Sequence, residues 1–228
     1  MLSAIAIVPS APVLVPELAG AAAAEVADLA SDVVAAAALL PPSWIVVGTG
    51  PADDVLGPNA AGTFAGFGAD VPIRLTPQEP VELLDLPLCA LIAGWVRGLA
   101  RPEAVAQVRV YAGDHDADAA LDRGRQLRAE IDRMPGPVGV LVVADGTNTL
   151  TTSAPGGYDP GNADAQLALD DALATGDVAA LTRLPAQIVG RVAFQVLAGL
   201  TGPAPRSAKE LYRGAPYGVG YFAGIWQM

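Results

Sequence analysis

The sequence predicts an α/β protein, a three-layer α/β/α sandwich around a central, mostly parallel or mixed sheet. Short apolar runs alternate along the 228 residues with longer helical segments, and this order builds a sheet with helices on both faces. The runs at residues 3–8, 44–47 and 138–143 are apolar throughout, as expected of strands buried on both sides. Because no linker or repeat divides the chain, we expect one domain over residues 1–228.

A strand and a helix open the chain. Residues 3–8 form the strand, which Pro9 ends. Pro16 then begins a helix that we expect to reach Leu40, because proline suits the first helical turn. The Pro41-Pro42 pair stops this helix.

A glycine-rich loop follows the second strand, at residues 44–47. It covers residues 48–68, and loops of that length inside a compact domain are usually functional or disordered. Residues 71–75 predict a further strand. The apolar pattern of residues 81–99 predicts a helix that Pro87 kinks or splits.

The second half of the chain continues the alternation. We expect strands at residues 107–111 and 138–143, a helix between them at 116–133, and a polar loop at 144–161. Three helices follow, expected at residues 163–175, 177–183 and 185–201. Two extended aromatic segments, expected at residues 207–212 and 218–226, complete the sheet.

Composition excludes several classes of function. Thirteen basic and 24 acidic side chains give a net charge of −11, which makes nucleic acid an unsuitable partner. One Cys and one His rule out an intrachain disulfide, a thiolate-rich metal site and any site needing two imidazoles of one chain. The start lacks the basic region of a signal peptide, and apolar stretches such as residues 86–96 are shorter than the ~20 residues of a bilayer span. We therefore expect a cytoplasmic protein with no membrane contact.

Three loops leave the carboxyl ends of predicted strands, at residues 9–16, 48–68 and 144–161. If the strands are parallel, these loops share the edge where α/β sheets bind ligands. Asp145 follows the most apolar strand and precedes Gly146-Thr147-Asn148. Its carboxylate is placed either to contact a ligand or to close an Asx-type turn with nearby backbone, and the sequence favours neither.

His115 is the only histidine and lies between Asp114 and Asp116. It is either a general base or weak metal ligand, or a solvent-facing residue beside a helix that Asp116 caps. The second interpretation is favoured.

Three segments carry a resemblance to a known family. They are Pro9-Ser10-Ala11-Pro12 with Val15-Pro16-Glu17-Leu18, the run from Ala144 to Leu150 with Ala154 to Pro160, and the ending Ala215-Pro216-Tyr217-Gly218-Val219-Gly220-Tyr221. Together they resemble the class III extradiol ring-cleavage dioxygenase B-subunit (LigB-like) superfamily, which includes the Memo-like proteins. The resemblance implies its scaffold and cleft, and a non-haem Fe(II) site.

The histidines of that family do not carry over. Ser10 stands at the first iron-ligand position, Thr49 and Gly50 lie near the second, and Asn148 takes the place of the acid/base histidine. Two imidazoles and a carboxylate hold Fe(II) in such sites, so we expect no metal and no cofactor.

The sequence thus predicts a divergent, dioxygenase-like protein that is non-catalytic and either binds a small molecule in its cleft or serves in assembly. The candidate cleft contacts are Ser10, Thr49, Gly50, Asp145, Asn148 and Tyr158. One alternative is a metal-independent acid–base enzyme that uses Asp145 with a Tyr or His115. Another is an iron dioxygenase with ligands not evident in the sequence. A homodimer is expected because the aromatic C-terminal strand leaves apolar surface to cover.

Overall fold

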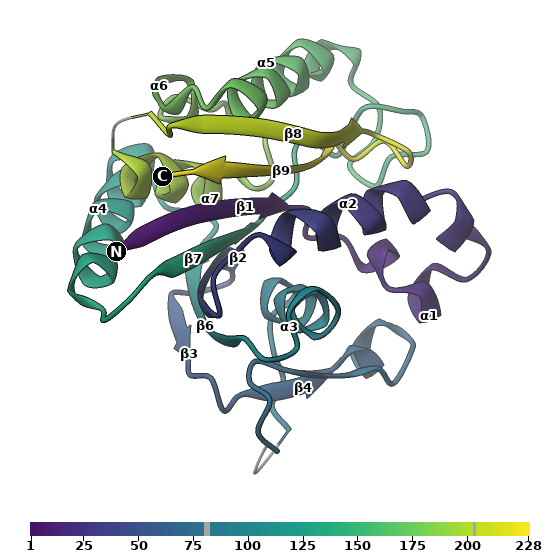
Figure 1. The fold of residues 1–228 in the computed structure, drawn as a ribbon. Coiled ribbons are helices and arrows are strands. Elements are labelled where there is room, and N and C mark those ends of the chain that lie inside the picture. Colours follow the sequence, from purple (N-terminus) through teal and green to yellow (C-terminus); the bar gives the residue numbers. More distant parts are fainter. Residues whose placement is uncertain (80–82, 203) are drawn as a thin grey trace.

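The computed structural model describes residues 1–79, 83–202 and 204–228. Within them seven strands form one sheet in the order β3-β6-β2-β7-β1-β9-β8 (Figure 1). The strands are β1 (Leu2–Val8), β2 (Ser43–Gly50), β3 (Asp54–Leu56), β6 (Val105–Ala112), β7 (Val138–Val143), β8 (Ser207–Gly214) and β9 (Tyr221–Gln227).

The four central strands, β6, β2, β7 and β1, run parallel to one another. The outer strands break this pattern, because β3 is antiparallel to β6, β9 to β1 and β8 to β9. The predicted mixed, mostly parallel sheet is therefore confirmed.

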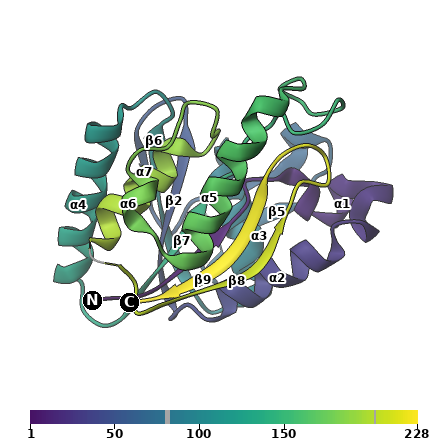
Figure 2. The same cartoon turned by 90° about the horizontal axis from the view of Figure 1, so that it is seen from above.

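Helices cover both faces of the sheet (Figure 2). One face packs on α2 (Ala27–Ala38) and α3 (Leu88–Ala100). The other packs on α4 (Ala117–Arg133), α5 (Ala163–Thr175), α6 (Val178–Leu181) and α7 (Arg191–Thr201). Successive strand residues point to opposite faces, so in β1 Ile5 and Ile7 join the second core while Ala6 and Val8 join the first. These two cores confirm the three-layer sandwich.

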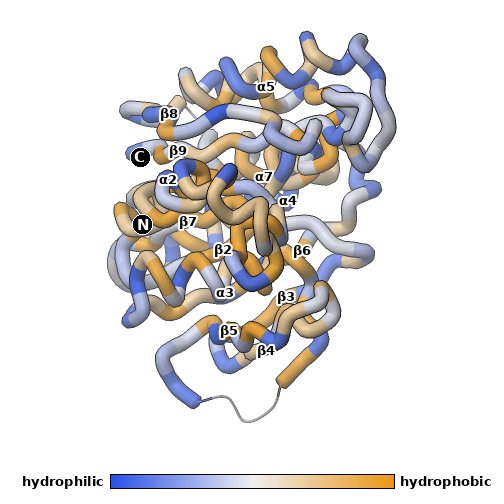
Figure 3. The backbone as a smooth tube through the Cα atoms, turned by 90° about the vertical axis from the view of Figure 1, so that its right-hand side faces the viewer, coloured by the Kyte–Doolittle hydropathy of each residue, from blue (hydrophilic) through white to orange (hydrophobic). Residues whose placement is uncertain are grey.

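Hydrophobic residues are concentrated along the central strands and α3, whereas α5 at the margin alternates between hydrophobic and hydrophilic residues (Figure 3). Among the helices of the described residues, none combines the length and apolarity needed to cross a bilayer.

The prediction of one continuous helix from Pro16 to Leu40 is wrong. The chain instead forms α1 (Pro16–Ala19), a 3₁₀ turn η2 (Gly20–Ala24) and then α2. Gly20 takes φ = +55°, which is not helical. The alanines of η2 have no buried residue among them, and a helix becomes stable only where α2 buries an apolar face.

Two further boundaries differ from the predictions. In the segment 81–99 the helix begins only at Leu88, after Pro87, and residues 83–87 are not helical; Val81 and Glu82 lie outside the described residues. The helix expected at 185–201 begins at Arg191, because Gly190 donates its N–H to the Asp145 carbonyl instead.

The loop expected at residues 48–68 contains regular structure. Strand β2 extends to Gly50 by pairing with β6, and β3 follows at the edge of the sheet. A separate two-stranded sheet forms from β4 (Ala61–Thr63) and β5 (Pro72–Arg74), below α3 in Figure 1. A 3₁₀ turn, η3 (Phe64–Phe67), follows β4. The final extended segment begins as a strand only at Tyr221, and residues 218–220 form loop contacts instead.

Candidate functional site

The loops after β1 and β7 meet at the carboxyl edge of the sheet, as the parallel strands predict. Val8 and Val143 are register partners at the ends of these strands. Two residues further along each chain segment, the Ser10 backbone N–H donates to Asp145 Oδ1 at 2.8 Å. The first and third predicted loops are therefore joined directly through Asp145.

Asp145 is in surroundings that disfavour its charge. Its side chain is half-buried, and burial raises the pKa of the carboxyl to about 6, although the hydrogen bond from the Ser10 amide opposes part of this rise. Its partner comes from 135 positions away in the chain, so the Asx-turn interpretation is wrong. The structure uses the backbone of Ser10 and not its hydroxyl.

A buried polar chain supports the backbone just after Asp145. The Thr147 N–H donates to Gln166 Oε1 at 2.8 Å, and Gln166 Nε2 donates to Asp170 Oδ1 at 2.8 Å. Burial raises the pKa of Asp170 to about 6. A Cβ on Gly146 would lie 2.0 Å from Gln166 Oε1, so glycine is needed there to let Gln166 approach the loop.

The C-terminal segment closes this loop from the other side. The Gly146 N–H donates to the Gly220 carbonyl and the Gly220 N–H donates to the Thr147 carbonyl, both at 2.8 Å. A Cβ on Gly220 would lie 2.1 Å from the Gln166 side chain. The loop after β7 is therefore fixed by three separate parts of the chain.

The other sequence candidates are not gathered around Asp145. Thr49 and Gly50 are the last residues of β2 and pair with Tyr111 and Ala112 of β6. The Asn148 carbonyl accepts a hydrogen bond from the Gly156 amide, and the Asn148 amide side chain packs against Gly156. Tyr158 is 55% exposed. Of the six candidates, only Ser10 and Asp145 are brought into direct contact.

A shallow groove of about 390 Å³ lies at the same edge of the sheet. All three predicted loops and the segment before β9 contribute to it, through Pro12, Val13, Phe67, Pro155, Tyr217 and Tyr221. None of the six sequence candidates lines the groove. The scarcity of aromatic residues, 5% of the chain, is a signal in the sequence that could single out Tyr217 and Tyr221, but such residues usually serve packing.

Tyr221 connects the groove to Asp145. Burial raises the pKa of the Tyr221 hydroxyl, and the nearby negative charge of Asp145 raises it further. At the rim, the Tyr217 hydroxyl donates to Glu25 Oε2 at 2.9 Å. The groove is thus mainly apolar, with the neutral phenols of Tyr217 and Tyr221 in its lining.

His115 belongs to a different cluster. Asp116 caps α4 as predicted, since its carboxylate accepts the Ala119 N–H at 2.8 Å. The expectation that His115 faces solvent is wrong, because its side chain is 21% exposed and its Nε2 lies 2.7 Å from Asp53 Oδ1. Asp53 Oδ2 also lies 3.0 Å from Arg123 Nη2. Burial alone would raise the pKa of Asp53, but the Ala112 amide and His115 outweigh this effect and lower it.

The donor set at the carboxyl edge does not fit Fe(II). Among the six candidates, Asp145 is the single carboxylate. The others are the hydroxyls of Ser10 and Thr49, the amide of Asn148, the phenol of Tyr158 and Gly50, which has no side-chain ligand. Across residues 1–79, 83–202 and 204–228, His, Cys, Asp and Glu nowhere form a group of three that could hold a metal ion.

Comparisons with known proteins define the fold. A scan against models of protein families finds no match, and a search of the curated proteins finds none either. Among solved structures, the uncharacterized protein JW3007 from Escherichia coli K12 is similar over 98% of this chain and 99% of that chain, with a TM-score of 0.58 and 9% sequence identity. At that identity the similarity supports the α/β fold and nothing about function.

Proposed function

We propose that the protein binds a small, partly apolar molecule in the groove at the carboxyl edge, on a scaffold like that of the LigB-like dioxygenases but without their iron chemistry. The observation that carries this proposal is the convergence of all three strand-end loops and the C-terminal segment on one groove. Its volume lies in the range of roughly 300–1,000 Å³ in which proteins hold small ligands.

The lining determines what kind of ligand is suitable. Proline, valine and aromatic side chains supply apolar contact area, which provides most of the affinity of small-molecule sites. A hydroxyl or amide on the ligand then has Tyr217 and Tyr221 as partners.

A library of small neutral molecules tests the proposal, with backbone amide chemical shifts of the full chain as the readout. We expect ligands that bind saturably to shift the amide signals of Ala11, Val13 and residues 217–221. Val13→Arg places a charge in the groove and is expected to abolish these shifts. Val105→Arg, at the opposite end of the sheet, is the matched control and should leave them unchanged. Shifts that saturate elsewhere, or that survive Val13→Arg, would contradict the proposal.

Acid–base catalysis by Asp145 is the second candidate function. A carboxyl group with a pKa of about 6 is present in both protonation states near neutral pH, as a general acid or base requires. The earlier pairing of Asp145 with His115 receives no support, because His115 contacts Asp53. A titration of the Asp145 carboxyl carbon by NMR that gives a pKa near 4 would exclude this role while leaving binding in the groove intact.

A further inference from the structure

A pocket of about 560 Å³ lies where α3 packs against the small sheet of β4 and β5 (Figure 3). Strand β5 and the residues that follow it, as far as Pro77, form one wall, and the second half of α3 forms the other together with Pro102. Arg74 comes from β5 and Arg97 from α3. Among the described residues that line the pocket there is no Asp or Glu. Its lining is therefore positively charged, in a chain whose net charge is −11.

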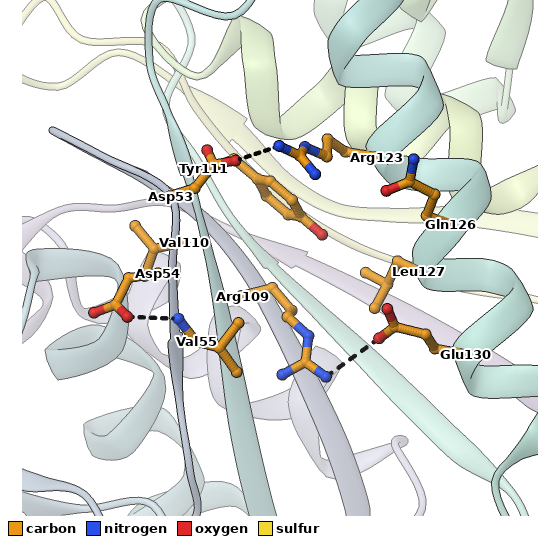
Figure 4. Close-up of a pocket in the computed structure, with 10 residues that line it drawn as sticks. All are labelled: Asp53, Asp54, Val55, Arg109, Val110, Tyr111, Arg123, Gln126, Leu127 and Glu130. Atoms are coloured by element: carbon orange, nitrogen blue, oxygen red, sulfur yellow. Dashed lines mark hydrogen bonds and ion pairs between the residues drawn. The ribbon is translucent and has the colours of Figure 1, made fainter.

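The pocket between the β3–β6 edge of the sheet and α4 shows the opposite arrangement (Figure 4). There Arg109 Nη2 lies 3.3 Å from Glu130 Oε2, and Arg123 Nη2 lies 3.0 Å from Asp53 Oδ2. Both carboxylates belong to that pocket, so they occupy the guanidiniums that an anion from solvent would need. The described lining of the pocket at α3 contains no such competitor.

Arg97 is held in place by backbone carbonyls and is only 6% exposed. Its Nε donates to the Arg74 carbonyl at 2.9 Å, and its Nη1 donates to the carbonyls of Pro102 and Ala104 at 2.6 and 3.2 Å. These acceptors are neutral, and within residues 1–79, 83–202 and 204–228 Arg97 forms no ion pair. Its Nη2 has no hydrogen-bond partner in the same ranges, but unlike Arg109 Nη1 it retains accessible surface. Arg97 therefore brings to the pocket a fixed charge with two N–H donors not used by the described chain.

Arg74 adds a second positive charge to the pocket. Burial lowers the pKa of Arg97, and the charge of Arg74 lowers it further, whereas Glu103 raises it. Arg74 Nη1 lies 2.8 Å from Glu79 Oε1, but the Glu79 side chain is 82% exposed and does not line the pocket. Exposed ion pairs of this kind are weak, so an anion in the pocket can replace Glu79. Because the two arginines repel one another, an anion between them also removes that repulsion.

We propose that this pocket binds a small aromatic carboxylate, with the carboxylate group between Arg74 and Arg97. A carboxylate only accepts hydrogen bonds, and its two oxygens suit the planar guanidinium. Most of the remaining lining is apolar and includes Trp95, which is half-buried, and Leu99, which is 55% exposed. An aromatic ring gains contact area against these side chains. The pocket shares no residue with the groove at the carboxyl edge, so this site does not depend on the proposed function.

A titration of the full chain with sodium benzoate tests the site, with backbone amide chemical shifts and the side-chain N–H of Trp95 as the readout. Benzamide, which has the same ring but no charge, and sodium chloride at matched ionic strength are the controls. We expect saturable shifts for Arg74, Thr76, Trp95 and Gly98 with benzoate only, with half-saturation in the millimolar range or below. The proposal is overturned if benzoate does not saturate at tens of millimolar, if the shifts lie elsewhere, or if benzamide binds equally well.

One pair of substitutions separates specific binding from a general effect of charge. Arg74→Gln removes one of the two guanidiniums but keeps the backbone carbonyl that holds Arg97, so the fold is retained. Binding of benzoate is expected to weaken about tenfold, because charged hydrogen bonds are lost. Arg101→Gln is the matched control at the end of α3, since Arg101 pairs with Glu103 and does not line the pocket. Equal weakening by the two variants would show that only the overall charge matters.

Three further substitutions leave the arginines intact. Glu79→Gln removes the carboxylate that competes for Arg74 and is expected to tighten benzoate binding about two- to threefold. Leu99→Glu places a carboxylate in the lining and is expected to abolish binding. Leu167→Glu on α5, at the same exposure of 55%, is its matched control and should have no effect. Weaker binding to Glu79→Gln, or equal binding to the two leucine variants, would contradict the proposal.

Discussion

The Asp145 carboxyl makes the folded state sensitive to pH. Its pKa is about 6 in the folded chain against an ordinary value of 3.8. Well below pH 4 the group is neutral in both states, so it has no effect on the free energy of unfolding. As the pH rises toward 6, the unfolded chain releases this proton while the folded chain retains it, so the contribution of Asp145 to stability falls and then stays low.

Asp145→Asn is therefore expected to stabilise the protein at pH 7 and above, by on the order of 2–3 kcal/mol, and to have little effect near pH 4. The amide oxygen still accepts the Ser10 N–H, so the loop contact is retained. Urea unfolding of both proteins across this pH range measures the difference. Asp170 titrates in the same window but is common to both proteins and cancels. A difference in unfolding free energy between the two proteins that stays constant with pH would contradict the raised pKa of Asp145.

Only part of the site could be predicted at the level of residues. Asp145 was accessible to prediction because a carboxylate directly after a buried strand has a known position on the sheet. The contact with Ser10 involves the backbone, which no side-chain pattern reveals. Asp53 and His115 are 62 positions apart, and Arg109 looked like an ordinary polar residue in a strand. Such pairings depend on tertiary packing.

Helices α4 and α7 pack backbone against backbone where two glycines cross. A Cβ on Gly124 would lie 2.2 Å from the Val196 carbonyl oxygen, and one on Gly199 would lie 2.1 Å from the Leu121 carbonyl oxygen. Because these neighbours are main-chain atoms, they cannot turn aside as a flexible side chain does. The closeness of this helix pair therefore depends on both glycines.

Gly124→Ala and Gly199→Ala are each expected to lower the free energy of unfolding by about 1–3 kcal/mol, as overpacking of a dense interior does. Gly98→Ala is the control in α3, where a Cβ meets no atom within 4 Å. Alanine favours the helix there and is expected to stabilise the protein by up to about 1 kcal/mol. Chemical denaturation measures the free energy of unfolding of all three variants. An unchanged value for Gly124→Ala would show that the two helices can move apart without loss of stability.

Elements with a strong local pattern were predictable. The apolar strands β1 and β7 and the capped helix α4 lie where the sequence places them. The three-residue strands β3 and β4 were missed, because their pairing partners rather than their own residues make them strands. The break at Gly20 was missed because the alanines after it have high helix propensity, and burial begins only further along.

At the scale of the whole molecule, acidic charge exceeds basic charge by 11. Exposed ion pairs such as Arg128–Asp132 contribute little, typically below about 1 kcal/mol each. Repulsion among the uncompensated acids therefore dominates the surface electrostatics and opposes the compact state.

Sodium chloride is consequently expected to stabilise the protein at pH 7, by about 1 kcal/mol between low salt and physiological ionic strength, where the screening length is about 8 Å. Thermal unfolding at a series of salt concentrations measures the effect. It should shrink as the pH approaches 4, since protonation removes the excess charge. Destabilisation by salt at pH 7 would mean that the ion pairs outweigh the repulsion.

The position of β9 bears on self-association. The sequence predicts a homodimer that covers apolar surface on the C-terminal strand, but β9 lies inside the sheet between β1 and β8, and Tyr221 to Trp226 are buried. The edge strand β8 instead carries Lys209, Glu210 and Arg213, and charged edges discourage pairing between chains. The C-terminal strand therefore offers no apolar surface in support of the predicted dimer.

The two cores each contain a fully buried indole. Trp44 lies in the layer of α2 and α3, with Nε1 donating to the Pro41 carbonyl, and Trp226 lies in the layer of α4 to α7, with Nε1 donating to the Leu173 carbonyl. The protein thus carries an intrinsic fluorophore on either side of its sheet. The third tryptophan, Trp95 of α3, packs against the layer of α2 and α3. Trp226→Phe therefore leaves emission from that layer alone, whereas Trp44→Phe combined with Trp95→Phe leaves only Trp226, so that loosening of one half can be observed separately from the other.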